Sequence, residues 1–201
     1  MPSNIDPIAL TAALVRCPSV TPIEGGALVL LEEILSGAGF ACTRVDRNGI
    51  CNLYARWGRQ GANRTFGFNG HTDVVPVNRD GWDRDPFGGE LIDGEVWGRG
   101  AIDMLGLTSA MAVVFRHLAD TNFRPKGDLI FFGVADEESG SKYGAQWMAD
   151  NHPDAIRSDY VLTENGGLHG GSESRPTVTM NVGEKGVAWR RLRVKGTPGH
   201  G

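Results

Sequence analysis

The sequence predicts an α/β fold with a mostly parallel central sheet, and three observations lead to that prediction. Apolar stretches of strand length alternate along the chain with segments in which apolar residues recur at helical spacing. The stretch 128–135 is apolar after its first residue, which is typical of a strand buried on both faces. The chain also carries no internal repeat. Strands and helices that alternate in this way form a sheet covered by helices.

Four segments are predicted to be helices. In the second, Leu28, Leu31 and Leu35 lie on one helical face, and Gly39 is placed to end it. Asn4 is expected to cap the first helix. The predicted helices span residues 5–15, 24–38, 105–118 and 142–149.

Short β-rich stretches between these helices are predicted to be strands. They span residues 42–45, 52–57, 65–69, 128–135 and 160–163. Asn48-Gly49 forms the turn between the first two. A small hairpin is expected around Asp93-Gly94 in the turn-rich stretch 81–98. From about Pro176 the pattern changes, and 177–182 and 187–194 are predicted to be two successive strands that open a second domain.

Composition and charge exclude several classes of protein. The net charge is −4, with 20 basic and 24 acidic residues and no block of Lys and Arg, so we expect neither a nucleic-acid partner nor a membrane-surface role. The three cysteines are too few and too scattered for a disulfide framework. We see no signal-peptide pattern at the N-terminus and no apolar stretch of membrane length. We therefore expect a cytoplasmic protein.

The residues that could bind a metal share one placement, because each follows a predicted strand or precedes a predicted helix. They are His71 after the strand 65–69, Glu137 and Glu138 after the strand 128–135, Glu164 after the strand 160–163, and Asp103 ahead of the helix 105–118. In open α/β sheets, sites form at the carboxyl ends of the strands. We therefore expect these side chains to converge at one edge of the sheet.

Imidazole nitrogen and carboxylate oxygen are ligands that suit zinc, and a carboxylate can bridge two cations. Adjacent strand residues point to opposite faces, so Glu137 and Glu138 can share a site only if the chain turns within 136–140. Each residue also has an alternative explanation: His71 could be a turn histidine, Asp103 a helix cap, Glu164 a turn cap, and the acidic triplet 136–138 a solvated strand end. The combination in this order favours the metal site.

Three motifs resemble those of one enzyme family. They are FNGHTDVVP at 68–76, WGRGAIDM at 97–104 and ADEESG at 135–140. Together they are similar to the dinuclear zinc amidohydrolase and exopeptidase family, which includes aminoacylase, carboxypeptidase S, glutamate carboxypeptidase, acetylornithine deacetylase and succinyl-diaminopimelate desuccinylase. The resemblance covers most of residues 5–201 and implies a zinc-exopeptidase-like sandwich.

The resemblance implies a role for each matching residue. His71, Asp103 and Glu164 would bind one zinc ion, and Asp103 would bridge to a second ion that Glu138 also binds. Glu137 would be the general base. Asp73 would hydrogen-bond His71 and fix its tautomer. His200, within a stretch 196–200 that resembles the family's lid motif, would polarise the scissile carbonyl; without the resemblance it is a lone histidine in a Gly/Pro turn.

The same resemblance implies the domain organisation. Residues 1–180 would form most of the catalytic domain, and 181–201 would begin a smaller α+β lid and dimerisation domain, giving a homodimer in the full-length protein. Family members are about twice this long, and a late histidine of the second zinc site is missing. We therefore expect a fragment that binds the second zinc weakly and has little turnover alone.

The leading hypothesis is a hydrolase that cleaves an amide bond of N-acyl amino acids or small peptides, with two zinc ions, or cobalt or manganese in their place. Glu164-Asn165-Gly166-Gly167 differs from the Glu-Pro-Thr of desuccinylases, which tilts the interpretation toward the aminoacylase and carboxypeptidase S branch. The alternative enzyme is a biosynthetic deacylase such as a desuccinylase or acetylornithine deacetylase. The rival of another class is an inactive protein that retains the metal.

Overall fold

The computed structural model describes residues 5–58, 64–121, 123, 125–164, 167–183, 186, 188, 190–193 and 195–196. The chain divides into two compact units, Met1–Glu164 and Asn165–Gly201. Each unit is described by itself. The predicted domain boundary near residue 180 stays a prediction.

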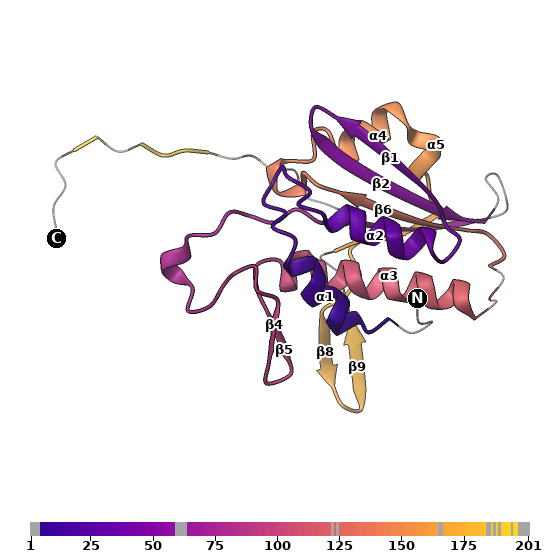
Figure 1. Cartoon of the computed structure of the whole chain (residues 1–201), viewed down its shortest axis with the longest axis horizontal. Coiled ribbons are helices and arrows are strands. Elements are labelled where there is room, and N and C mark those ends of the chain that lie inside the picture. Colours follow the sequence, from indigo (N-terminus) through magenta and orange to yellow (C-terminus); the bar gives the residue numbers. More distant parts are fainter. Residues whose placement is uncertain are drawn as a thin grey trace. The chain divides into compact units, whose positions relative to one another are not determined.

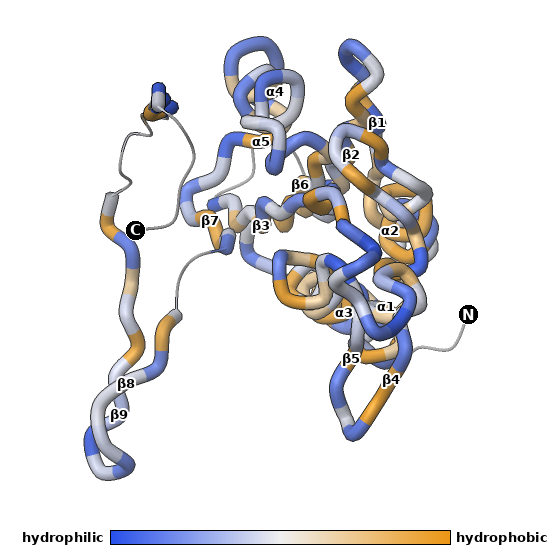
Figure 2. Tube along the Cα trace, turned by 90° about the vertical axis from the view of Figure 1, so that its left-hand side faces the viewer, coloured by the Kyte–Doolittle hydropathy of each residue, from blue (hydrophilic) through white to orange (hydrophobic). Residues whose placement is uncertain are grey.

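The first unit is built on a five-stranded sheet of order β1-β2-β6-β3-β7, of which Figure 1 labels β1, β2 and β6 and Figure 2 labels all the strands. Only β2 runs against the others, because it pairs antiparallel with β1 and β6, while β3 pairs parallel with β6 and β7. The strands are β1 (Ala41–Arg47), β2 (Ile50–Trp57), β3 (Thr65–His71), β6 (Asp128–Val134) and β7 (Tyr160–Leu162). This confirms the predicted α/β fold with a mostly parallel central sheet.

Helices cover both faces of this sheet (Figure 2). The larger core lies under α1 (Pro7–Val15), α2 (Ala27–Ser36) and α3 (Gly106–Asp120), and the smaller core lies under α4 (Ala145–Asn151) and α5 (Pro153–Ile156). Strand β6 supplies both cores, because Phe131 packs into the larger one while Ile130 and Phe132 pack into the smaller one. This explains why its sequence is apolar without alternation.

The helix ends differ by a few residues from the predicted ones. Helix α1 begins at Pro7, and the Asp6 side chain accepts a hydrogen bond from the Ile8 backbone N–H at 3.0 Å. Asp6 is therefore the cap, and the predicted cap Asn4 lies outside the described residues. Helix α2 ends at Ser36, ahead of the predicted stop at Gly39, which takes a φ of 91° in the turn that follows.

The predicted hairpin is present around Asp93-Gly94. It consists of β4 (Glu90–Ile92) and β5 (Glu95–Trp97), and both turn residues have positive φ, 51° and 87°. Three further single turns are η1 (Arg79–Gly81), η2 (Ala101–Leu105) and η3 (Glu137–Ser139). The last two carry residues of the candidate site.

The segment Ala101–Asp120 is long and apolar enough to cross a membrane by length and composition alone, which the sequence analysis did not expect. In the structure it is η2 followed by α3, and Ala112 and Phe115 are fully or almost fully buried in the larger core. Its apolar face is therefore used for packing against the sheet.

The strand predicted at 177–182 is present only at Thr177 and Val178, and the described residues of 187–194 form no strand. The second unit instead contains a hairpin of β8 (His169–Ser172) and β9 (Arg175–Val178). Val178, Met180 and Val182 do alternate, but all three are exposed. Thr179 still exchanges backbone hydrogen bonds with Gly167 and Leu168, but alternation alone does not extend a strand further where no described strand pairs with it.

Candidate metal centre

Three neighbouring parallel strands end at the same edge of the sheet, and each leads into a candidate ligand. Strand β3 ends at His71, β6 ends at Val134 shortly before Glu137, and β7 ends at Leu162 shortly before Glu164. His71 pairs with Val134 in the register of β3 and β6. The predicted convergence of these segments is therefore present.

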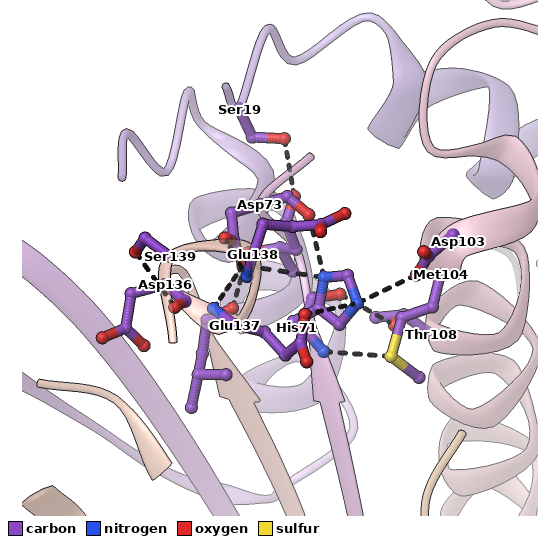
Figure 3. Close-up of polar contacts among 12 residues, drawn as sticks. Ser19, His71, Asp73, Asp103, Met104, Thr108, Asp136, Glu137, Glu138 and Ser139 are labelled. Atoms are coloured by element: carbon purple, nitrogen blue, oxygen red, sulfur yellow. Dashed lines mark hydrogen bonds and ion pairs between the residues drawn. The ribbon is translucent and has the colours of Figure 1, made fainter. Parts of the chain in front are cut away.

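The imidazole of His71 is the centre of the cluster (Figure 3). Its Nε2 atom lies 3.1 Å from Asp103 Oδ1, 3.4 Å from Glu164 Oε2 and 3.7 Å from Glu137 Oε2. The side chain of His71 is 1 % exposed, so the three carboxylates lie against a buried ring. Three carboxylate oxygens around one imidazole nitrogen form a donor set for a cation.

The other ring nitrogen fixes the tautomer. His71 Nδ1 lies 2.8 Å from the backbone carbonyl oxygen of Asp73. Because a carbonyl can only accept, Nδ1 carries the hydrogen and donates it. In the neutral ring, Nε2 then presents its lone pair toward the carboxylates, where a metal ion would bind.

Asp73 hydrogen-bonds His71, as the sequence analysis expects, but through its backbone. Its backbone carbonyl, and not its carboxylate, makes the hydrogen bond to His71, and Asp73 Oδ1 lies 3.6 Å from Nδ1. The two carboxylate oxygens accept the backbone N–H groups of Glu137 and Glu138, each at 3.1 Å. Asp73 therefore connects the loop after β3 to the turn that carries both glutamates.

The turn η3 resolves how two adjacent glutamates reach one site. Strand β6 has ended at Val134, so Glu137 and Glu138 lie on a helical turn and do not alternate across a sheet. Two groups of possible ligand atoms result, His71 with Glu137 and Glu164, and His71 with Asp103 and Glu138; within each group the atoms lie within 4.8 Å of one another. The division of these residues into ligands and a base stays a prediction.

Asp103 lies on η2 ahead of α3. Its φ and ψ of −111° and 101° are not helical, and its side chain is 65 % exposed. The N-cap residue of α3 is Leu105, which makes no side-chain cap hydrogen bond. The alternative that Asp103 serves only as a helix cap is therefore not supported by the structure. Gly100, at φ 85°, has no room for a Cβ, which would lie 2.5 Å from Val74 Cγ1.

Two residues that the sequence analysis missed hold the backbone of the site. Thr108 Oγ1 donates to the carbonyl of His71 at 3.2 Å, which joins α3 to β3. Ser19 Oγ donates to the carbonyl of Thr72 at 2.6 Å. Both are single hydroxyl residues without a local motif, so only their tertiary contacts identify them.

Burial and the neighbouring carboxylates shift the pKa values within the cluster. Burial lowers the pKa of His71, but the hydrogen bond to Asp73 and the charges of Asp73, Glu137 and Glu164 outweigh it, so the pKa is raised. Burial raises the pKa of Glu137, and burial and Asp103 raise that of Glu138. In the described part of the chain no arginine or lysine forms an ion pair with Asp103, Glu137 or Glu138. A bound cation would supply the missing positive charge.

A pocket of about 180 Å³ adjoins the cluster, lined by His71, Glu137, Ser141, Thr163 and Glu164, among others. His200 lies outside the described residues, as do Asn165 and Gly166. The predicted contribution of His200 therefore stays a prediction.

Comparison with known proteins gives a consistent result. The sequence pattern of peptidase family M20/M25/M40 matches residues 67–195. A protein named succinyl-diaminopimelate desuccinylase from Cereibacter sphaeroides is 61 % identical over 151 residues, which are 72 % of this chain and 39 % of that protein. The same-named protein from Paracoccus denitrificans is 43 % identical over 203 residues, 97 % of this chain and 50 % of that protein. This chain thus spans about half the length of the curated relatives it matches, or less.

Solved structures show the same fold at lower identity. An M20 family metallo-carboxypeptidase from Sulfolobus solfataricus superimposes with a TM-score of 0.71 at 23 % identity, over 82 % of this chain and 38 % of that chain. Human carnosine dipeptidase 1 gives a TM-score of 0.67 at 21 % identity, over 81 % of this chain and 40 % of that chain.

Proposed function

This chain belongs to peptidase family M20/M25/M40, and we propose from that premise that it carries the metal-binding part of a hydrolase that deacylates N-acyl amino acids. The family membership confirms the resemblance seen in the three sequence motifs, and the family is metal-dependent. The chain is 48 % identical over 204 residues to a second relative named succinyl-diaminopimelate desuccinylase, from another Cereibacter sphaeroides strain, and covers 51 % of it. The activity of the whole protein is therefore part of the proposal.

The observation that carries the proposal is the convergence of three carboxylate oxygens within 3.1–3.7 Å of His71 Nε2. One imidazole nitrogen among carboxylates fits zinc, and cobalt or manganese less specifically. His71, Asp103, Glu138 and Glu164 would hold two ions. When bound, the ions would lower the pKa of a water molecule and polarise the amide carbonyl.

Glu137 is proposed as the general base. Burial raises the pKa of Glu137. A general base works best when its pKa lies near the operating pH, so this shift favours the role. In the reaction the water oxygen bonds to the amide carbon, the carbon–nitrogen bond breaks, and Glu137 moves the water's proton to the departing amine. Asp73 serves this step indirectly, because it holds both the His71 ring and the backbone of Glu137.

The relatives favour an N-succinyl amino acid as the substrate. The proteins that match at 48–61 % identity are named succinyl-diaminopimelate desuccinylases. The difference from Glu-Pro-Thr at Asn165-Gly166 points the other way, toward the aminoacylase branch, but it concerns two residues, whereas the similarity extends over 151 to 204 residues. The proposal therefore takes the biosynthetic deacylase, which the sequence analysis gave as the alternative.

A cytoplasmic location and a homodimer of the full-length protein complete the proposal. The three cysteines are free in the structure, which fits a reducing compartment. The dimer is supported by the resemblance of 196–200 to a lid motif.

The proposal is tested on the full-length protein that contains this sequence. We expect zinc in the purified protein by elemental analysis, and release of succinate from an N-succinyl amino acid. Glu137→Gln should lower kcat by about 10²–10⁴-fold, the range for losing a general base, while the zinc content stays unchanged. An N-acetyl amino acid and a dipeptide serve as comparison substrates. If the zinc-loaded protein hydrolyses none of these substrates, the inactive metal-binding alternative is favoured.

A further inference from the structure

Asp136 is a buried acid beside the metal centre that has no place in the proposed chemistry. It is 2 % exposed and directly precedes Glu137 and Glu138. Its carboxylate points away from His71, as Figure 3 shows. We infer that Asp136 is a positioning residue, which holds the loop 136–144 so that Glu137 and Glu138 face the metal centre. This inference rests on the proposed function.

Both the side chain and the backbone carbonyl of Asp136 accept hydrogen bonds from the residues that follow it. The carboxylate Oδ2 atom accepts the backbone N–H groups of Tyr143 at 2.8 Å and Gly144 at 3.0 Å. The backbone carbonyl accepts the N–H groups of Ser139 at 3.2 Å and Ser141 at 2.8 Å. One residue therefore folds the following eight residues back on themselves, up to the start of α4.

The fit around the carboxylate is tight. A Cβ atom at Gly144 would lie 1.9 Å from Asp136 Oδ1, so no side chain can be accommodated there without moving the carboxylate. Asn52, which is fully buried on β2, donates to the carbonyl of Tyr143 at 3.0 Å and to that of Val45 at 3.0 Å. The loop is thereby attached to the sheet at the residue that Asp136 binds.

The glutamates lie between this anchor and a second one. On the side of the site, Asp73 accepts the backbone N–H groups of Glu137 and Glu138. On the other side, Asp136 closes the loop that follows them. A turn bonded at both ends has little freedom to rotate, so the two side chains keep one orientation toward His71.

The test compares three variants of this chain. Asp136→Ala removes the carboxylate, and Asp136→Asn keeps one oxygen that can accept both N–H groups. Asp6→Ala is the control, because the Asp6 side chain also accepts a backbone N–H at a helix start but caps α1. Zinc affinity is measured by titration calorimetry, the visible spectrum with Co²⁺ reports ligand geometry, and amide hydrogen exchange reports the N–H groups of Glu137 and Glu138.

We expect Asp136→Ala to weaken zinc binding by about 10–100-fold, the usual effect of removing a residue that orients metal ligands, and to alter the Co²⁺ spectrum. The amides of Glu137 and Glu138 should exchange roughly tenfold faster. Asp136→Asn should lie nearer the unchanged protein, and it decides the question if the alanine variant does not fold. Asp6→Ala should change none of these readouts.

Two results would overturn the inference. One is unchanged exchange at Glu137 and Glu138 in Asp136→Ala, and the other is faster exchange with an unaltered zinc affinity. If the unchanged chain takes up no zinc, the proposed function fails, but the exchange measurement still decides whether Asp136 holds the glutamates.

Discussion

At the scale of single residues, Asp73 and His71 explain how the centre is pre-arranged. Asp73 uses its carbonyl to orient the His71 ring and its two carboxylate oxygens to bind the backbone of Glu137 and Glu138. It is fully buried, and burial raises its pKa. A buried carboxylate that satisfies two N–H donors is costly to remove.

Asp73→Ala should therefore weaken zinc binding by about 10–100-fold. The His71 ring keeps its carbonyl partner, but Glu137 and Glu138 lose theirs. Asp128→Asn is the control, since Asp128 is equally buried and hydrogen-bonded, at the opposite end of β6. Titration calorimetry measures both variants. A zinc affinity lowered as much by Asp128→Asn as by Asp73→Ala would show a general loss of folding.

Protons and zinc compete for His71, which gives a pH dependence. The pKa of His71 is raised, so protonation begins at a higher pH than in a free histidine, and a protonated Nε2 cannot bind a metal. Zinc affinity should thus be greatest above the raised pKa and fall as the pH is lowered from about 8 to about 5. Glu137 and Glu138, whose pKa values are raised by burial, add to the fall at the acidic end. Calorimetric affinities that stay constant over that range would contradict this assignment.

At the scale of elements, a few buried polar contacts join strands to one another and attach a helix to the sheet. Arg56 on β2 binds Asp128 on β6 at 2.6 Å and also donates to the carbonyls of Asp154 and Ala155 in α5. Asp128 is 1 % exposed at its side chain. This pair therefore holds α5 against the sheet.

Arg56→Met should destabilise the protein by about 3–5 kcal/mol, because it leaves the Asp128 carboxylate buried without its charged partner. Arg84→Met is the matched control: its pair with Glu90, at 2.9 Å, is exposed, and losing such a pair costs about 0–1 kcal/mol. Urea denaturation measures the free energy of unfolding of both variants. An equal effect of the two substitutions would mean that burial does not set the strength of the Arg56 pair.

At the scale of the whole molecule, the sequence predicted the sheet and the convergence of the candidate ligands. Both predictions depend on local patterns, because each ligand candidate follows or precedes an apolar segment. The roles of Asp73 and Asp136 depend on which backbone N–H groups come near them, and no local pattern encodes that. The strand predicted at 177–182 ends at Val178, and none forms in the described residues of 187–194, because alternation does not indicate whether a pairing partner is present.

The cluster draws its side chains from four separate segments, those after β3, β6 and β7 and η2. A bound cation therefore joins parts of the fold that otherwise repel each other through their carboxylates. Zinc at about 1,000 times its Kd adds about 4 kcal/mol to the free energy of unfolding. In a chain of this size each kcal/mol raises Tm by about 2–4 °C, so zinc should raise Tm by roughly 8–16 °C and a chelator should reverse the rise.

His71→Ala should abolish the shift, whereas His152→Ala, which removes a ring packed on Trp147, should retain it. A zinc-induced shift that survives His71→Ala would place the stabilising ion elsewhere, and the centre at the edge of the sheet would lose its main physical argument.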